Sequence, residues 1–263
     1  MLTLVTHLVD LFLHQVYTIY VNTILSMVNI KIEGEKMSKG IFITATGTDI
    51  GKTFVTALIV KKLRDAGLNA GYYKAALSGA EEQPDGSWLP GDAAYVAKIS
   101  GMQEKGEELV SYIYKTAVSP HLAAMREGNP VELDKVKADF AKAQAKYDYV
   151  TMEGSGGIIC PIRWDEQHIL LEDVIKAVDL GTLVISNAAL GSINACVLTI
   201  AYLRQKGIPV RGIILNNYDG SDFMQADNKK MMEAITGVPV LAEVKPNDTE
   251  LDIDIEVLKS LYK

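Results

Sequence analysis

From residue 39 onward, short apolar stretches rich in β-branched residues alternate with longer stretches in which apolar positions recur every three or four residues. The continuous stretches are typical of strands buried in a parallel sheet, and the spaced ones of amphipathic helices. The predicted strands are Ile41 to Thr46, Ala70 to Lys74, Tyr147 to Glu153, Thr182 to Asn187, Val210 to Asn216 and Val240 to Val244. The predicted helices are Lys52 to Ala66, Val131 to Lys146, Ile169 to Val178, Ile193 to Lys206 and Gln225 to Thr236. This alternation predicts a three-layer α/β fold, with a mainly parallel central sheet covered by helices on both faces.

The first 36 residues do not follow this pattern. From Leu2 to Ile30 the chain is largely apolar, but polar residues interrupt it and no Lys or Arg precedes it. A secretory signal begins with basic residues, and a spanning helix has about 20 cleaner apolar residues. We expect residues 1–36 to be an N-terminal extension, Met37 to be a candidate start of the native protein, and residues 37–263 to form a single domain. The alternative is a membrane anchor in the extension.

Composition and charge exclude several kinds of partner. The formal net charge is −7, which argues against nucleic acid because that binding neutralises phosphates with clustered Lys and Arg. The chain has two cysteines, far apart and without metal-ligand spacing, so we expect neither a disulfide nor a zinc site. These features favour a reducing compartment, the cytoplasm, and no membrane partner.

A phosphate-binding motif follows the first predicted strand. It reads Thr46-Gly47-Thr48-Asp49-Ile50-Gly51-Lys52-Thr53 and matches the P-loop pattern, except that Thr46 replaces the first glycine. Backbone N–H groups at a helix N-terminus cradle phosphate oxygens, a lysine offsets their charge, and a Thr hydroxyl ligates Mg²⁺. The sequence therefore predicts a P-loop NTPase fold that binds a nucleotide and Mg²⁺. The expected nucleotide contacts here are Thr48, Asp49, Ile50, Gly51, Lys52 and Thr53.

Absent features narrow the class of P-loop protein. Partition and septum-site ATPases carry a second lysine early in the loop, where this chain has Gly47. GTPases carry Asn-Lys-x-Asp after a later strand, where this chain has Asn216-Asn217-Tyr218-Asp219. Both classes are therefore disfavoured.

Several further motifs, in their order and spacing, resemble the dethiobiotin synthetase family over roughly residues 39–250. They are the P-loop, Gly71-Tyr72-Tyr73-Lys74 with Ser78-Gly79, Ser119-Pro120-His121, Glu153-Gly154-Ser155-Gly156-Gly157 and Leu190-Gly191-Ser192-Ile193-Asn194. Ala45, Asp49 and Ala75 depart from residues that are frequent in the family, which puts individual contacts in doubt rather than the class.

The resemblance implies a reaction. A carbamate forms from carbon dioxide and one amine of 7,8-diaminopelargonate, and the γ-phosphoryl group of ATP activates it as a mixed carbamic-phosphoric anhydride. The second amine then closes the ureido ring to give dethiobiotin, ADP and phosphate, a step in biotin biosynthesis. The family also implies a homodimer with the active site at the subunit interface.

The resemblance also assigns roles to residues. Lys52 and Lys74 would be catalytic, with Lys74 at the end of the second strand. The Mg²⁺ ligands would be Thr53, Asp92 and Glu153, and Asn216 would hydrogen-bond the adenine. The substrate-binding residues would be Thr48, Lys74, Ser78, Gly156, Leu190, Ser192 and Asn194.

Plainer interpretations stay open for some of these residues. Asp92 precedes a helical stretch and would also suit a helix N-cap, and Ser119-Pro120 reads first as a helix start. The segment from Leu190 to Asn194 also suits a simple strand-to-helix turn.

Two rival classes remain. One is another amidoligase, such as the synthetase portion of a cobyric acid synthase. That class usually continues into a glutamine amidotransferase domain, for which we expect no room in this chain. The other is a non-synthetic ATPase of the partition or metallochaperone class, which would need the extra loop lysine or a Cys-x-x-Cys. Both absences favour the synthetase.

Overall fold

The computed structural model describes residues 38–263, and every structural statement below concerns these residues. By their contacts, Ser38–Lys263 form a single unit. Residues 1–36 and Met37 lie outside the described residues, so the N-terminal extension and the candidate start stay predictions.

Strands and helices alternate along the described chain. The strands are β1 (Lys39–Ala45), β2 (Ala70–Ser78), β3 (Glu81–Glu82), β4 (Trp88–Leu89), β5 (Val110–Tyr114), β6 (Tyr149–Glu153), β7 (Pro161–Trp164), β8 (His168–Leu170), β9 (Thr182–Ser186), β10 (Val210–Asn216) and β11 (Val240–Val244). The helices are α2 (Lys52–Asp65), α3 (Gly91–Ser100), the 3₁₀ helix η1 (Gly106–Leu109), α4 (Pro120–Glu127), α5 (Leu133–Lys146), α6 (Leu171–Ala177), α7 (Ser192–Gln205), α8 (Phe223–Thr236) and α9 (Ile255–Leu261).

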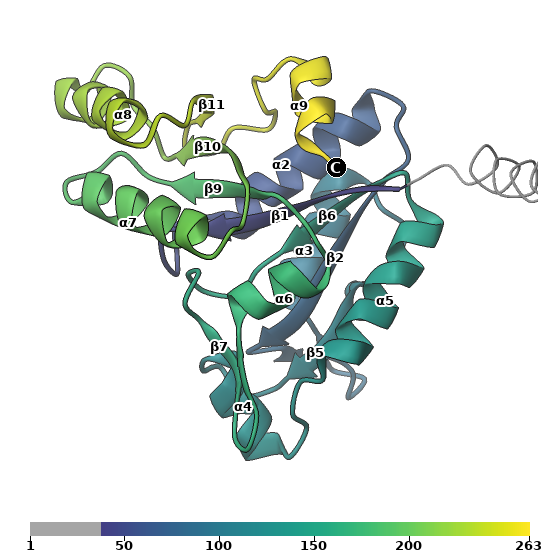
Figure 1. The fold of residues 1–263 in the computed structure, drawn as a ribbon. Coiled ribbons are helices and arrows are strands. Elements are labelled where there is room, and N and C mark those ends of the chain that lie inside the picture. The colour runs from purple at the N-terminus through teal and green to yellow at the C-terminus, as the bar shows by residue number, and fades with distance from the viewer. Residues whose placement is uncertain (1–37) are drawn as a thin grey trace, which may run out of the picture. The chain divides into compact units, whose positions relative to one another are not determined.

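Seven of these strands form one sheet, in the order β11-β10-β9-β1-β6-β2-β5. Every neighbouring pair in it is parallel, so all seven carboxyl ends lie along one edge (Figure 1). The first strand along the chain, β1, lies in the middle, between β9 and β6. This arrangement confirms the predicted α/β fold and places the loops that follow β1, β2 and β6 next to one another.

Helices cover both faces of the sheet. Successive side chains of a strand point to opposite faces, so one strand contributes apolar side chains to two separate layers of the core. On β1, Ile41 and Ile43 belong to the apolar cluster that includes residues of α2 and α9. Phe42 lies between them in sequence and belongs to the cluster that includes residues of α5, α6 and α7. Figure 1 shows these two groups of helices on opposite sides of the sheet, which gives the predicted three layers.

The second strand is longer than predicted, and this changes the place of Lys74. The prediction ended the strand at Lys74, whereas β2 continues to Ser78. The extension pairs with β5, an edge strand that the sequence analysis did not identify, in the register Ala76↔Tyr112 and Ser78↔Tyr114. Lys74 is therefore inside a strand, where it is only 3% exposed.

The helix predicted from Ile169 to Val178 also begins elsewhere. Residues His168–Leu170 form β8, which pairs with β7 as an antiparallel hairpin, and α6 follows from Leu171 to Ala177. A backbone hydrogen bond from Leu171 N–H to the carbonyl of Cys160 ties the end of this hairpin back to the chain before it. The prediction was wrong there because strands of three or four residues carry too little periodicity to be recognised.

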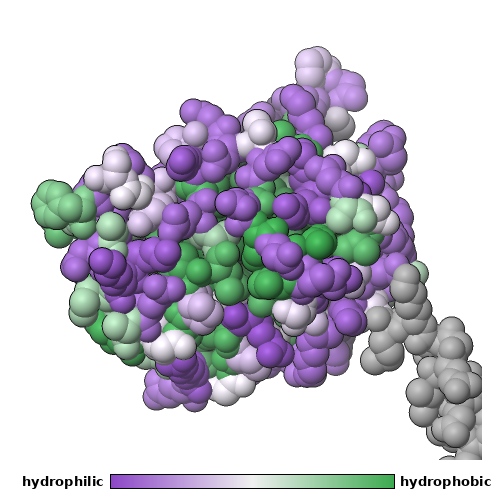
Figure 2. Space-filling model, turned by 90° about the horizontal axis from the view of Figure 1, so that it is seen from above, coloured by the Kyte–Doolittle hydropathy of each residue, from purple (hydrophilic) through white to green (hydrophobic). Residues whose placement is uncertain are grey.

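The face of the described unit that Figure 2 shows is largely polar. On the face shown in Figure 2, hydrophilic side chains dominate and hydrophobic ones show between them. Within residues 38–263, no helix is both long enough and apolar enough to cross a membrane.

Candidate active site

The loop between β1 and α2 forms the floor of the site. Gly51, the residue before α2, has φ +93°, a left-handed conformation that favours glycine. A Cβ atom there would lie 2.1 Å from Nδ2 of Asn216, which itself donates a hydrogen bond to the carbonyl of Ile50 at 2.9 Å. Asp49 also has positive φ, at 60°. The loop is thus held in a curled shape with the N-terminus of α2 at its end.

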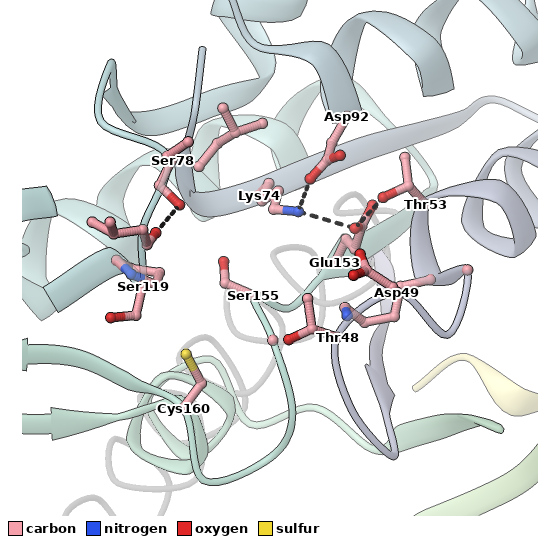
Figure 3. Close-up of a pocket in the computed structure, with 17 residues that line it drawn as sticks. Thr48, Asp49, Thr53, Lys74, Ser78, Asp92, Ser119, Glu153, Ser155 and Cys160 are labelled. Carbon is pink, nitrogen blue, oxygen red and sulfur yellow. Dashed lines mark hydrogen bonds and ion pairs between the residues drawn. The ribbon is translucent and has the colours of Figure 1, made fainter. Parts of the chain in front are cut away.

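A cavity of about 790 Å³ opens above this loop (Figure 3). This volume is within the range of small-molecule sites in proteins. The lining residues come from the loop after β1 and the start of α2, from β2 and α3, and from the end of β6 and the segments that follow β5 and β6. They are Thr48, Asp49, Gly51, Lys52, Thr53, Lys74, Leu77, Ser78, Asp92, Ala117, Val118, Ser119, Pro120, Glu153, Ser155, Gly156 and Cys160. Ten of the predicted site residues therefore share one cavity.

The charged side chains of this cavity form a connected cluster (Figure 3). Lys74 Nζ lies 2.5 Å from Asp92 Oδ2 and 3.0 Å from Glu153 Oε1. The hydroxyl of Thr53 donates to the same Glu153 oxygen at 2.8 Å. The register of β2 on β6 explains the contact, since Lys74 pairs directly with Glu153. Asp92 reaches the cluster from the first turn of α3, whose N-cap is Pro90 rather than Asp92.

The two lysines have different electrostatic surroundings. Burial would lower the pKa of Lys74, but the charges of Glu153 and Asp92 outweigh it and raise the pKa above its ordinary value. Burial lowers the pKa of Lys52, and the same carboxylates only partly offset that effect. The charge of Lys74 is thus compensated within the protein, whereas that of Lys52 is not. A bound anion would be favoured most beside Lys52.

Lys52 stands at the first position of α2, 8% exposed, and its Nζ donates to the carbonyl of Gly47 at 3.3 Å. That weak contact curls the lysine back over the loop. Phosphate oxygens bound to the backbone N–H groups of this helix end would lie beside its ammonium group. The arrangement is able to hold a polyphosphate.

The donor set around Glu153 suits a magnesium ion. Thr53, Asp92 and Glu153 offer one hydroxyl and two carboxylates, the hard oxygen ligands that Mg²⁺ takes together with waters and substrate phosphates. Among residues 38–263 no group of three or more His, Cys, Asp or Glu side chains forms a cage for a metal. One hydroxyl and two carboxylates leave the remaining ligand positions of such an ion to waters and phosphate oxygens.

The far wall of the cavity is built by the segment before α4. Ser119 is the N-cap of α4 and Pro120 begins it, as the plainer interpretation expected, and both also line the cavity. Ser78 Oγ donates to the carbonyl of Val118 at 2.5 Å, which holds this segment against the end of β2. The wall is thus fixed to the sheet.

Five predicted site residues lie outside this cavity, namely Ile50, Asn216, Leu190, Ser192 and Asn194. Asn216 is 3% exposed behind the loop, beside Ile50, and its Oδ1 is buried without a hydrogen-bond partner among the described residues. Leu190, Ser192 and Asn194 lie at the N-terminal end of α7, where Leu190 is 88% exposed. These three residues do not line the cavity.

Among the residues that sequence reasoning missed, Cys160 and Tyr72 bear on the chemistry of the site. Cys160 lines the cavity and is a free thiol, and burial raises its pKa above the ordinary value. Tyr72 is completely buried and donates to Glu153 Oε2 at 3.0 Å. Its position two residues before Lys74 on a strand was a usable signal, because such residues share a face.

Comparison with known proteins places this site in a class. A protein-family model described as an AAA domain matches residues 39–252. The MinC:MinD cell division protein complex of Aquifex aeolicus has a TM-score of 0.51 at 14% identity, over 79% of this chain and 81% of that one. A ParA family ATPase from Chlorobium tepidum TLS has a TM-score of 0.51 at 14% identity, over 85% and 90%. These likenesses concern the fold alone, and with the loop they define a P-loop nucleotide-binding protein.

Closer relatives define the family. The ATP-dependent dethiobiotin synthetase BioD of Clostridium botulinum (strain Eklund 17B / Type B) is 48% identical over 226 residues, which cover 86% of this chain and 99% of that protein. The protein of the same name from Brachyspira hyodysenteriae (strain ATCC 49526 / WA1) is 50% identical over 228 residues, 86% of this chain and all of that protein. The chain belongs to the dethiobiotin synthetase family.

Proposed function

We propose that this protein is an ATP-dependent dethiobiotin synthetase of biotin biosynthesis, which joins carbon dioxide to 7,8-diaminopelargonate and closes the ureido ring. Family membership supports the reaction. The observation that carries it is that one cavity holds both the phosphate loop with Lys52 and the cluster of Lys74, Asp92 and Glu153.

The positions of Lys52 and Lys74 support separate roles for them in phosphoryl transfer. One amine of the substrate attacks carbon dioxide and loses a proton, which gives a carbamate. A carbamate oxygen then attacks the γ-phosphorus of ATP, and the bond to the β-γ bridging oxygen breaks to release ADP. Phosphoryl transfer needs positioning and charge neutralisation more than covalent help. Lys52 would neutralise the β- and γ-phosphates, and Lys74 the carbamate and the transferring oxygens.

Ring closure completes the reaction. The second amine attacks the carbonyl carbon of the mixed anhydride, phosphate leaves, and the amine loses its proton. The two reacting groups belong to one molecule, so the step gains effective molarities of about 10⁵ M or more when the substrate is held in a reactive conformation. Ser78 and Gly156 would contact the substrate, and the wall at Ser119 would limit its movement.

Magnesium would be held by Thr53, Asp92 and Glu153. When bound, the ion would supply positive charge to the β- and γ-phosphates. The side chains of this chain would keep their oxygens in one cluster, where the ammonium group of Lys74 pairs with both carboxylates.

Residues outside the cavity would bind the adenine ring of the nucleotide and the substrate of a neighbouring subunit. Asn216 has one buried acceptor without a partner, which suits a hydrogen bond from the amino group of adenine. Leu190, Ser192 and Asn194 would contact the substrate carboxylate of a neighbouring subunit, so the active unit would be a homodimer. Light scattering would then give twice the monomer mass. We place the protein in the cytoplasm, with Met37 as its start.

Oxygen labelling tests this chemistry. Freshly mixed ¹⁸O-bicarbonate, ATP and 7,8-diaminopelargonate are expected to give phosphate that carries one ¹⁸O atom, because the attacking carbamate oxygen leaves with the phosphoryl group. Phosphate with oxygen from water, formed without the diamine, would indicate an ATPase and contradict the proposal.

Replacing Glu153 with Gln is expected to lower kcat about 100-fold, the usual loss when one preorganised stabilising group is removed. The Mg²⁺ concentration needed for half-maximal activity rises, whereas KM for the diamine changes less than about twofold. Steady-state kinetics with Mg²⁺ and diamine varied separately would check both statements.

Glu172→Gln is the matched control, because Glu172 is also a buried glutamate, 4% exposed, and pairs with Lys206 at 2.8 Å away from the cavity. The folded Glu172→Gln protein is expected to have the same kcat and the same dependence on Mg²⁺ concentration as the wild type. Equal losses in the two variants would mean that Glu153 acts only on stability.

A further inference from the structure

Glu153 presents its two carboxylate oxygens to different surroundings. Oε1 faces the cavity, where it accepts from Thr53 Oγ1 at 2.8 Å and from Lys74 Nζ at 3.0 Å (Figure 3). Oε2 points away from the cavity and accepts from the hydroxyl of Tyr72 at 3.0 Å. Within the described part of the chain, Tyr72 is the one donor recorded for Oε2.

Tyr72 reaches Glu153 because of where its strand lies. In the register of β2 on β6, Tyr72 pairs with Thr151 and Lys74 with Glu153, so Tyr72 and Lys74 point to the same face of the sheet. Tyr72 is 0% exposed and does not line the cavity. It therefore touches neither nucleotide nor diamine, and any effect on the reaction passes through Glu153.

The hydroxyl of Tyr72 acts as a donor at all ordinary pH values. Burial and, secondly, the charge of Glu153 raise its pKa well above the usual range of a phenol. A neutral phenol that donates to one carboxylate oxygen restricts rotation of the carboxylate plane. Hydrogen bonds of this kind to metal-binding side chains orient the ligand and tune its affinity.

We propose that Tyr72 is a positioning residue, whose hydroxyl fixes Oε2 of Glu153 so that Oε1 alone is presented to the magnesium ion. The inference builds on the proposed metal site at Thr53, Asp92 and Glu153 and adds a residue to its support. The buried ring could pack equally well as phenylalanine, so the hydroxyl is the group under test.

Tyr72→Phe tests the inference without removing the ring from the core. With ADP bound, electron paramagnetic resonance of Mn²⁺ is expected to show about 10-fold weaker binding of that ion, the lower end of the loss seen for such supporting groups. ADP binding in EDTA and the diamine KM stay unchanged. The thermal midpoint measured in EDTA shows whether the variant is folded.

Tyr73→Phe is the matched control. Tyr73 is the next residue on β2, is 3% exposed, and donates its hydroxyl to the carbonyl of Val136 on the opposite face of the sheet. Loss of this hydroxyl is expected to leave Mn²⁺ binding unchanged.

A double-mutant cycle separates positioning from a general structural effect. In the Glu153→Gln background, the further change Tyr72→Phe should no longer weaken Mn²⁺ binding, because Tyr72 acts through the carboxylate. Mn²⁺ binding by a folded Tyr72→Phe protein that equals wild type would overturn the inference and leave the proposed function standing. Failure of the wild-type protein to bind Mn²⁺ with ADP would overturn the metal site itself.

Discussion

Replacing Lys52 with Ala is expected to lower dethiobiotin formation by about 10³-fold or more. A cation that stabilises the charge of a transferring phosphoryl group contributes a factor of this size. The buried charge of Lys52 has no full partner within the described chain, since its recorded hydrogen bond is a weak one to the carbonyl of Gly47. The phosphates of ATP would supply the missing partner. Turnover measured at saturating ATP would show the loss directly.

The fold should survive this substitution. Lys52 has no short ion pair to break, and alanine is the best helix former for the start of α2. Lys62→Ala provides a control from the same helix, ten residues further on and outside the cavity. We expect it to keep normal turnover. Near-normal activity of Lys52→Ala would contradict the proposal that the phosphate loop takes part in the reaction.

Lys74→Met is the second substitution with a large expected effect. Turnover should fall about 10³-fold, because the group that would neutralise the carbamate and the transferring oxygens is lost. Stability should fall as well. Glu153 is 1% exposed and loses its ion-pair partner, and an unpaired buried charge of this kind costs about 3 kcal/mol. Kinetics and thermal unfolding would be measured on the same preparation, with and without Mg²⁺.

Lys74→Arg separates the two effects. It keeps a positive charge between Asp92 and Glu153, so most of the stability should return. The planar guanidinium differs in shape from an ammonium group, so turnover should stay well below that of the wild type. Full turnover in Lys74→Met, with or without lost stability, would show that Lys74 serves the fold and not the reaction.

The central strands could be predicted because short, continuous apolar stretches rich in β-branched residues are typical of strands buried in a parallel sheet. β1, β9 and β10 are short apolar stretches buried in the sheet, and the loop after β1 has a sequence pattern that is specific to phosphate binding. Parallel strands bring their carboxyl ends to one edge, so the loop that carries Lys52 and the end of β6 at Glu153 lie on the same side of the sheet. Lys74 lies inside β2, and the register of β2 on β6 brings it to Glu153.

Other features depend on tertiary contacts that local sequence does not reveal. Ala75, Ala76 and Leu77 have no strong local preference for a strand, and they become one because β5 pairs beside them. The ion pair between Lys74 and Asp92 joins β2 to α3, and only the packed structure sets its distance. The hydrogen bond from Tyr72 to Glu153 crosses 81 residues of sequence.

The most direct test combines two readings from one reaction. Purified protein is incubated with ATP, Mg²⁺ and bicarbonate, with and without 7,8-diaminopelargonate, while phosphate is measured and dethiobiotin is followed by mass spectrometry. We predict phosphate release that depends on the diamine and equals dethiobiotin one to one. Release that is indifferent to the diamine, with no dethiobiotin formed, would contradict the proposed synthetase and indicate a P-loop ATPase.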